Sequence, residues 1–413
     1  MQELTWRGLV HQVTDPELGK LLDDDRLTAY IGFDPTADSL HVGSLIQITN
    51  LRRLQLGGHD VIALLGGGTG LIGDPSGRQE ERQLLDEASL DLNLAGIRSQ
   101  LERMLDGDAR IVDNGEWLRA MPLTDFLRDV GKHFSVNEMI RKESVRARLE
   151  GREQGISFTE FTYMLLQAWD FVHLFDQFGC RLQLGGSDQW GNITEGIGLI
   201  RRLRGAHAYG LTSPLVTLPS GGKMGKSEAG TVWLDARRTS PYQFFQYWIR
   251  ADDEHVGAYL RQFTFLDRDH IEELEAATAA HPERREAQRV LAREVTAFVH
   301  DADEAERAEH AAEVLFSEDI ARLDEATLLE VLADVPSSTV ADLRDLPLVE
   351  ALVRAGLSPS KSAARKAIEQ GGAYLNNRRV TDVDGHVTTE DLLHGRYVVL
   401  RRGKKDRALL RSD

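Results

Sequence analysis

The chain has 413 residues and a single cysteine, Cys180. One cysteine excludes a disulfide within the chain and any zinc site built from several cysteines. The sequence also lacks an apolar run near the roughly 20 residues that a membrane-spanning helix needs, and its mean hydropathy is -0.33. Residues 1–9 contain no apolar stretch typical of a secretory signal. These absences predict a cytoplasmic protein without contact with a membrane.

Positive charge is scarce as well, because 49 Lys and Arg stand against 66 Asp and Glu, a net charge of -17. A uniformly acidic chain would repel a polyanion. The charge is uneven, however: residues 354–413 hold 13 basic and 7 acidic residues, a net of +6 that leaves -23 for the rest of the chain. The sequence therefore predicts an acidic body and a basic carboxyl-terminal segment that can attract nucleic acid.

Strand and helix patterns alternate in the amino-terminal half. They predict a strand, a helix, a second strand and a glycine-rich loop at residues 28–33, 42–56, 60–65 and 66–77. This βαβ order predicts an α/β fold with a parallel sheet. From about residue 240 the pattern becomes helical, as at 287–300, where apolar residues recur every three to four positions.

The carboxyl-terminal part changes in character twice. Residues 301–350 contain 15 acidic and 3 basic residues and the prolines Pro336 and Pro347, a composition that indicates a linker. Two short helices are predicted next, at 348–355 and 360–370, each followed by a glycine. A turn at Asn376-Asn377 and a strand at 397–400 complete a small basic domain.

Gly68, Gly70 and Gly73 match the GxGxxG pattern of dinucleotide-binding proteins and follow a predicted strand. The pattern alone favours a nicotinamide-dependent oxidoreductase, or a glycine-rich turn where two backbones pack closely. A dinucleotide site requires a helix that begins at the glycines, whereas Pro75 restricts Asp74 to an extended backbone. We therefore expect a turn, and Asp74 becomes a candidate ligand-binding carboxylate at the end of a strand.

The junction before the helix at 42–56 carries His41. Asp38 or Ser39 is expected to cap this helix, and the amides of its first turn then form an anion site. A single histidine at a helix start is more often a surface or capping residue than a catalyst. His41 is therefore a candidate only in combination with other motifs.

Lys223 and Lys226 lie three residues apart in a loop that contains glycines. Two such lysines usually belong to a solvated loop. A Walker A phosphate-binding loop is excluded because Ser220 occupies the position of its first glycine. Contact with phosphate through another geometry stays open.

Taken in order, these motifs resemble the class I aminoacyl-tRNA synthetases. His41-Val-Gly-Ser44 is similar to their HIGH signature and Lys223-Met-Gly-Lys-Ser227 to their KMSKS signature. Four longer blocks, at residues 30–41, 70–77, 158–163 and 185–192, narrow the resemblance to the family of bacterial tyrosyl-tRNA synthetases. The basic tail resembles the small RNA-binding domain of pseudouridine synthases. Three positions depart from the family pattern, namely Ser44, Gly225 and Arg78.

This resemblance implies a domain organisation and an oligomeric state. It implies a Rossmann-type catalytic domain at 1–220, a helical anticodon-side domain with the KMSKS-like loop at 221–330, a linker at 331–346 and an α+β RNA-binding domain at 347–413. It also implies a homodimer.

The activity that the resemblance implies is ligation of L-tyrosine to tRNA(Tyr) through tyrosyl-adenylate. Mg²⁺ would arrive with the substrate ATP, and neither a protein nucleophile nor a protein-bound metal is expected. The implied tyrosine-binding residues are Tyr30, Asp74, Tyr163, Gln167 and Asp170. The implied ATP-binding residues are Asp34, Gly43, Ser44, Gly186, Asp188, Gln189 and Lys226. The implied catalytic residues are Thr36, His41, Arg82, Lys223 and Lys226.

The candidate RNA contacts are basic side chains of the tail: Arg365, Lys366, Arg378, Arg379, Arg401, Arg402, Lys404 and Lys405. Several of these could instead be ordinary solvated charges. A non-catalytic RNA-binding protein would explain this tail, but it would explain neither Asp74 and Asp170 nor the two lysines of the KMSKS-like loop. Among synthetases, tryptophan is the nearest alternative substrate.

One part of the tyrosine site follows from spacing alone. Tyr163, Gln167 and Asp170 stand at i, i+4 and i+7 and so share one face of a helix. Tyr163 could simply be a core residue. Asp170 on the same face needs a partner, because a half-buried carboxylate without one is costly.

Overall fold

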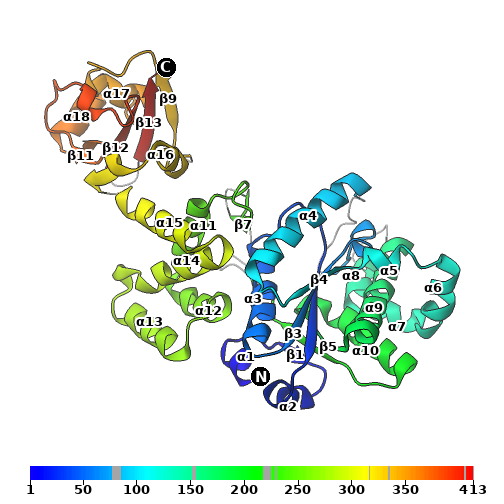
Figure 1. Cartoon of the computed structure of the whole chain (residues 1–413). Helices are drawn as coiled ribbons and strands as arrows, with labels where there is room; N and C mark the ends of the chain where they lie inside the picture. Colours follow the sequence, from blue (N-terminus) through cyan, green and yellow to red (C-terminus); the bar gives the residue numbers. More distant parts are fainter. Residues whose placement is uncertain are drawn as a thin grey trace. The chain divides into compact units, whose positions relative to one another are not determined.

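The computed structural model describes residues 1–76, 85–150, 155–216, 224, 226–227, 230–315, 317–333, 335–403 and 406–412. The chain divides into two compact units, which Figure 1 colours along the sequence. The larger unit holds residues 1–239 and 247–300, and the smaller unit holds residues 240–246 and 301–413. Among the described helices, none is long and apolar enough to cross a membrane.

A six-stranded sheet forms the centre of the larger unit, in the order β1-β6-β5-β2-β3-β4. Its strands are β1 (Gln12–Val13), β2 (Thr28–Phe33), β3 (Asp60–Leu65), β4 (Arg110–Asp113), β5 (Cys180–Gly186) and β6 (Tyr209–Ser213). All neighbours pair in parallel except β1, which runs antiparallel to β6 at one edge. The predicted α/β fold with a parallel sheet is confirmed, and β2 and β3 have the predicted bounds.

Helices cover both faces of this sheet. Figure 1 shows α3 (Val42–Leu56) and α4 (Glu87–Met104) on one face and α9 (Phe158–Phe178) and α10 (Trp190–Arg204) on the other. The chain runs from β2 outward to β3 and β4, and then returns to β5 on the opposite side of β2. The strand order thus reverses between β2 and β5, and α/β sheets bind ligands in the crevice at such a point.

The remaining elements of the larger unit flank this core. They are α1 (Gln2–Trp6), α2 (Glu17–Asp24), α5 (Gly115–Leu118), α6 (Leu123–Asp129), α7 (Val136–Ile140), α8 (Glu143–Glu150), β7 (Lys226–Ser227), β8 (Gly230–Thr231), α12 (Asp253–Phe263), α13 (Arg268–Ala280) and α14 (Glu286–Val299). Helix α11 (Pro241–Ile249) crosses the division between the units. The predicted helical region from residue 240 is confirmed.

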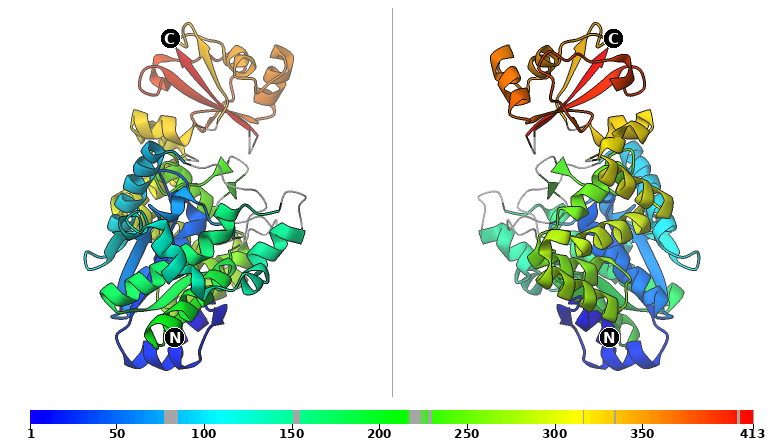
Figure 2. Two further views of the ribbon diagram at one scale, coloured as in Figure 1. Left: turned by 90° about the vertical axis from the view of Figure 1, so that its right-hand side faces the viewer. Right: turned by 90° about the vertical axis from the view of Figure 1, so that its left-hand side faces the viewer.

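The smaller unit is built on a five-stranded sheet in the order β11-β10-β12-β13-β9. Its elements are α15 (Ala302–Val314), α16 (Glu325–Val331), β9 (Ser337–Val340), α17 (Leu348–Arg354), α18 (Lys361–Glu369), β10 (Ala373–Leu375), β11 (Arg378–Arg379), β12 (Tyr397–Arg402) and β13 (Asp406–Ser412). Figure 2 shows α17 and α18 together on one side of this sheet. Their apolar faces bury a core with β10, β12 and β13.

Local turn chemistry explains several of the predicted boundaries in this unit. Gly356 and Gly371 have φ of 72° and 65° after α17 and α18, a conformation that glycine adopts without strain. Asn376 and Asn377, with φ of 47° and 63°, form the two-residue turn between β10 and β11. Ser360 caps α18, since its hydroxyl accepts from the amide of Ala363.

Residues 331–346, for which the sequence predicts a linker, contain β9 instead. This strand pairs in parallel with β13, so it is part of the carboxyl-terminal sheet. The acidic segment before β9 also contacts this sheet, because Glu325 accepts a hydrogen bond from the hydroxyl of Tyr397, in β12, at 2.9 Å. The sequence does not predict β9 because only Val340 of this strand is buried, so its residues show no alternation of apolar and polar side chains.

Candidate functional site

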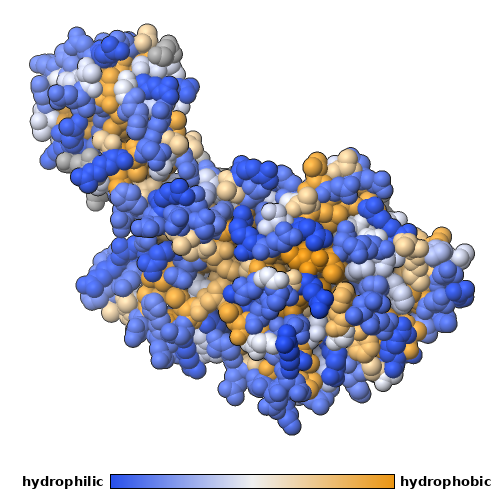
Figure 3. Space-filling view, viewed as in Figure 1, coloured by the Kyte–Doolittle hydropathy of each residue, from blue (hydrophilic) through white to orange (hydrophobic). Residues whose placement is uncertain are grey.

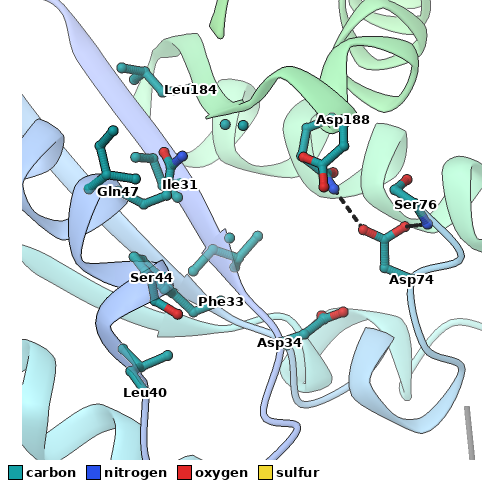
Figure 4. A pocket seen from close by; sticks show the side chains of 18 of the residues that line it. Ile31, Phe33, Asp34, Leu40, Ser44, Gln47, Asp74, Ser76, Leu184 and Asp188 are labelled. Carbon is teal, nitrogen blue, oxygen red and sulfur yellow. Dashed lines mark hydrogen bonds between the residues drawn. The ribbon is translucent and has the colours of Figure 1, made fainter. Parts of the chain in front are cut away.

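A cavity of about 390 Å³ opens at the carboxyl ends of β2 and β5. Figure 4 shows side chains from several elements directed into it. The predicted residues that line it are Tyr30, Asp34, Thr36, His41, Gly43, Ser44, Asp74, Tyr163, Gln167, Asp170, Gly186, Asp188 and Gln189. Arg82 and Lys223 lie outside the described residues, and of Lys226 only its place in β7 is described.

Tyr30 and Asp170 are deeply buried polar groups of this cavity, each with 1% of its surface exposed. The hydroxyl of Tyr30 is buried and has no hydrogen-bond partner within the described part of the chain. Burial raises the pKa of the Asp170 carboxyl to about 8, although two hydrogen bonds to it act in the opposite direction. Burial, followed by the nearby Asp170, also raises the pKa of Tyr30, which stays a neutral phenol. This end of the cavity therefore offers a hydroxyl and a carboxyl to a polar group on a ligand.

The two hydrogen bonds to Asp170 come from residues that the sequence analysis missed. Asn114 Nδ2 donates to one carboxyl oxygen and Trp117 Nε1 to the other, both at 2.8 Å. These residues follow β4, and Asn114 lies directly after the strand's last residue. Recognising β4 would have pointed to them, because the carboxyl ends of parallel strands meet at one edge of the sheet.

A second polar group surrounds Asp74, which is 8% exposed. One oxygen of its carboxylate accepts from Gln189 Nε2 at 2.7 Å. The other accepts from the amide of Ser76 at 2.9 Å, a bond drawn in Figure 4. Gln167 Nε2 in turn donates to Gln189 Oε1 at 3.3 Å. A carboxylate flanked by two amide side chains is suited to hold an ammonium group.

The predicted convergence of Tyr163, Gln167 and Asp170 is confirmed, since all three lie on α9 and line the cavity. The hydroxyl of Tyr163 donates to the carboxylate of Asp34, with distances of 3.1 and 3.2 Å to its two oxygens. Thr69 Oγ1 donates to the same carboxylate at 3.2 Å. Tyr163 therefore connects α9 to Asp34, in the segment that follows β2.

The helix cap at α3 differs from the prediction. His41, not Asp38 or Ser39, is the capping residue, and its Nδ1 accepts from the amide of Gly43 at 2.9 Å. Ser39 is engaged elsewhere, because its hydroxyl accepts from Gln100 Nε2 at 2.8 Å. Since Nδ1 of His41 is an acceptor, Nε2 carries the proton of the neutral ring and can serve as a donor.

The HIGH-like and KMSKS-like motifs meet at Gly43. A Cβ atom at this position would lie 2.8 Å from the backbone oxygen of Met224 and 2.7 Å from the ring of His41, so only glycine fits. Met224 is 4% exposed and lines the cavity. The close approach brings Met224 of the KMSKS-like motif against the first turn of α3.

The glycines of the loop after β3 allow its backbone to lie close to the side chains of Asp113 and Leu118. Only a 3-10 turn, Thr69–Leu71, forms at the GxGxxG pattern, and within the described residues no α-helix begins there. Asp113, at the end of β4, accepts from the amides of Gly67 and Gly115 at 2.9 and 2.8 Å and ties the loop to α5. The geometry is that of a turn, as predicted from Pro75, and not of a dinucleotide-binding helix start.

The candidate RNA contacts lie in the smaller unit, whose visible face is mostly hydrophilic in Figure 3. Arg365, Arg378 and Arg402 form exposed ion pairs with Asp384, Asp391 and Asp406. The guanidinium group of Arg401 stacks 3.6 Å above the ring of Tyr374. Arg379 donates to the backbone oxygen of Gly371 at 2.9 Å, and Lys366 is exposed. Lys404 and Lys405 lie outside the described residues.

Two family profiles match the chain. Residues 22–317 match "tRNA synthetases class I (W and Y)", and residues 327–410 match "Tyrosine--tRNA ligase SYY-like C-terminal domain". The first of these covers more than half of the chain.

Full-length relatives carry the same description. The tyrosine–tRNA ligase of Roseiflexus castenholzii is 53% identical over an alignment of 420 positions, which covers 100% of this chain and 99% of the relative. The tyrosine–tRNA ligase of Bacillus caldotenax is also 53% identical, over 418 residues with the same coverage. Among solved structures, a C-terminally truncated mitochondrial tyrosyl-tRNA synthetase of Aspergillus nidulans superposes with a TM-score of 0.69. It is 33% identical, and the match covers 76% of this chain and 93% of that one.

Proposed function

Because the chain belongs to the class I tRNA synthetases for tryptophan and tyrosine, and over its full length to the tyrosine–tRNA ligases, we propose that it joins L-tyrosine to the 3′-terminal ribose of tRNA(Tyr). ATP is the second substrate. The observation that carries the choice of tyrosine is the buried hydroxyl of Tyr30, unpartnered among the described residues, beside the carboxyl of Asp170. These two groups suit a ligand with an aromatic body and a hydroxyl tip.

In the first step, a carboxylate oxygen of tyrosine attacks the α-phosphorus of ATP, and the bond from that phosphorus to the β-phosphate breaks. Pyrophosphate leaves and tyrosyl-adenylate remains. In the second step, a ribose hydroxyl of tRNA attacks the carbonyl carbon, loses its proton, and AMP departs. No protein nucleophile takes part, so catalysis depends on positioning and on stabilising the charge that develops on the leaving pyrophosphate.

The tyrosine substrate is oriented by its two polar ends. Tyr30 and Asp170 hold the phenolic hydroxyl, and the group around Asp74 and Gln167 holds the α-ammonium. The supporting observation is that both groups line one cavity and receive side chains from a single helix, α9. The carboxylate of tyrosine is then directed toward the opening near α3.

The ATP substrate lies between α3 and β5. Gly186, Asp188 and Gln189, at the end of β5, are suited to the ribose, while Asp34, Gly43 and Ser44 line the opposite wall. The Nε2–H of His41 and the amides at the start of α3 favour negative charge. Thr36, Arg82, Lys223 and Lys226 complete the phosphate site in this proposal.

The magnesium ion belongs to the nucleotide and not to the protein. Among the described residues, no three His, Cys, Asp or Glu side chains are grouped so as to hold a metal. In this proposal Mg²⁺ arrives with ATP and is bound chiefly by the phosphate oxygens of the nucleotide. It neutralises part of the phosphate charge during attack.

The protein acts as a cytoplasmic homodimer in this proposal. Large apolar side chains on α6, α7, α8 and α9 are exposed, namely Leu123, Leu127, Val136, Ile140, Leu149 and Phe158. Leu123 is 71% and Phe158 75% exposed, and large apolar side chains exposed in this number support a protein interface. Sedimentation of the intact chain should give a dimer mass, and replacing Phe158 with Asp should shift it toward the monomer.

The test of the activity is ATP–pyrophosphate exchange with each proteinogenic amino acid in turn, followed by charging of tRNA. Tyrosine should support exchange far above every other amino acid. Exchange driven best by tryptophan would overturn the choice of substrate. Exchange with none of them would overturn the proposed activation step itself.

A further inference from the structure

Trp117 makes two contacts with α9 that lie one turn apart. Its indole Nε1 donates to Asp170 at 2.8 Å. Its ring also stacks face to face on the imidazole of His173, with the centroids 4.1 Å apart and the planes inclined by 13°. Asp170 and His173 stand at i and i+3, so the same face of the helix receives both the edge and the face of the indole.

The helix that carries Trp117 cannot hold it in place alone. Helix α5 has only four residues, and a single isolated turn is not stable by itself. The orientation of the indole must therefore come from its tertiary contacts. Its ring packs against a buried cluster that includes Tyr30 and Phe171, but apolar packing does not direct the N–H group. The stack on His173 does, because it fixes the plane of the ring.

We propose that His173 is a positioning residue for tyrosine recognition: it holds Trp117 in the orientation in which the indole N–H donates to Asp170. His173 is half-buried and lies outside the lining of the cavity. It acts through Trp117 and does not touch the substrate. This inference rests on the proposed function, since it assigns Asp170 to the hydroxyl of tyrosine.

Burial lowers the pKa of His173, so the ring is neutral at physiological pH and stacks as a flat aromatic group. The charged groups that face it are Asp176, on its own helix, and Glu116, on α5. The groups that face Asp170 are Asn114, Trp117, Tyr30, Asp34 and Asp113. The indole N–H opposes the rise that burial causes in the pKa of Asp170.

The test compares His173→Ala, which removes the stack, with His173→Phe, which keeps a flat ring. The Ala variant should raise KM for tyrosine about twofold to tenfold, a range expected for one aromatic pair. KM for ATP and the melting temperature should change little. The Phe variant should restore the parent value of KM for tyrosine.

The dependence of KM on pH separates this role from general loosening of the fold. In the parent enzyme, KM for tyrosine should fall as pH rises through about 8, because Asp170 becomes ionised. Without the indole donor, Asp170 ionises at a higher pH. The pH at which KM for tyrosine changes should therefore be higher in His173→Ala and unchanged in His173→Phe. Ionisation of tyrosine itself is common to all three proteins and cancels in the comparison.

A second variant, Trp117→Phe, keeps the stack and removes the N–H donor. Its effect on KM for tyrosine should match that of His173→Ala, and the double variant should be no worse than either single one. Additive effects, or equal losses for ATP and tyrosine in the Ala variant, would show that His173 only supports the fold. If the parent enzyme does not activate tyrosine at all, the proposed function fails and not this inference alone.

Discussion

The groups at the end of the cavity are poorly satisfied without a ligand. The hydroxyl of Tyr30 has no partner in the described part of the chain. The carboxyl of Asp170 lies beside it, and burial disfavours the negative charge of that carboxyl. A folded core normally avoids such groups, because each costs free energy until it is hydrogen-bonded. Their presence at a cavity marks a binding site, and it leads to two predictions about single residues.

The first prediction concerns tyrosine against phenylalanine. Phenylalanine would cover Tyr30 and Asp170 without offering a hydroxyl. Tyr30 would then stay without a partner among the described residues, and Asp170 would keep only the hydrogen bonds from Asn114 and Trp117. Each unmade hydrogen bond of this kind costs about 1–3 kcal/mol, which for two groups corresponds to at least about 30-fold in kcat/KM. ATP–pyrophosphate exchange with the two amino acids measures the ratio. Rates within about tenfold of one another would remove Asp170 from the hydroxyl site.

The second prediction concerns the stability of the free protein. The pKa of Asp170 is near 4 in an unfolded chain and about 8 in the folded one. Between these values the folded state holds the extra proton, so this group stabilises the fold at low pH and loses that contribution as pH rises toward 8. Asp170→Asn removes the ionisation. We expect denaturant unfolding at pH 5 and pH 8 to show that the free energy of unfolding of the variant, relative to that of the parent, is higher at pH 8 than at pH 5.

Tyrosine binding provides the control for this comparison. The Asn variant should lose affinity for tyrosine, because it presents one acceptor where the carboxylate presents two. A stability difference between variant and parent that is the same at both pH values would contradict the shifted pKa. A variant that unfolds at both pH values would instead show that the hydrogen bonds from Asn114 and Trp117 dominate.

At the scale of elements, the site depends on how closely α4 approaches the segment between β2 and α3. Gly96, in the middle of α4, lies against the backbone of this segment, and a Cβ atom there would overlap the carbonyl oxygen of Asp38. Asn93, one turn earlier, donates to the backbone oxygen of Pro35 at 2.9 Å. The segment that leads to His41 is thus held by backbone contact with a helix outside the cavity.

Gly96→Ala should consequently disturb the ATP side of the site. Alanine favours a helix, but here the backbone of Asp38 must move, and overpacking of this kind costs about 1–3 kcal/mol of stability. The rate of adenylate formation should fall, with KM for ATP affected more than KM for tyrosine. Gly198→Ala on α10 is the matched control, because its nearest neighbour is the flexible end of Arg202 at 3.6 Å. Equal behaviour of the two variants would contradict the proposed role of this contact.

For the whole molecule, the distribution of charge suggests that tyrosine activation and tRNA binding depend on different parts of the chain. The basic residues concentrate after residue 354 in a chain that is acidic elsewhere. The smaller unit has its own core of α17, α18 and the five-stranded sheet. It is therefore suited to attract tRNA through phosphate contacts, while the larger unit contains the cavity.

Removing residues 324–413 should leave tyrosine activation near the full-length rate and reduce tRNA charging by more than about tenfold. The cut precedes α16, because a cut after Leu346 would leave β9 without its partner β13. Full-length charging should weaken steeply as salt rises, whereas exchange should not. Comparable charging by the truncated and intact chains at physiological salt would show that the carboxyl-terminal unit is not the principal RNA-binding element.

Features that depend on residues close together in the chain could be predicted before the structure was known. Periodicity identified β2, α3 and β3, whose bounds agree with the structure. Pro75 excluded a helix start at the glycine-rich loop, and the positions of Tyr163, Gln167 and Asp170 on one helix face followed from the period of the helix. These are local consequences of backbone geometry, so they can be read along the chain.

Contacts between residues from distant segments became visible only in the folded chain. Asn114 and Trp117 reach Asp170 because the segment after β4 packs against α9 beside the cavity, and no local pattern encodes that contact. His41 displaces Ser39 as the helix cap because Gln100 of α4 occupies the serine. Strand β9 exists because β13, some 70 residues later, offers it an edge. Such contacts depend on packing between elements, which a single sequence specifies but does not display.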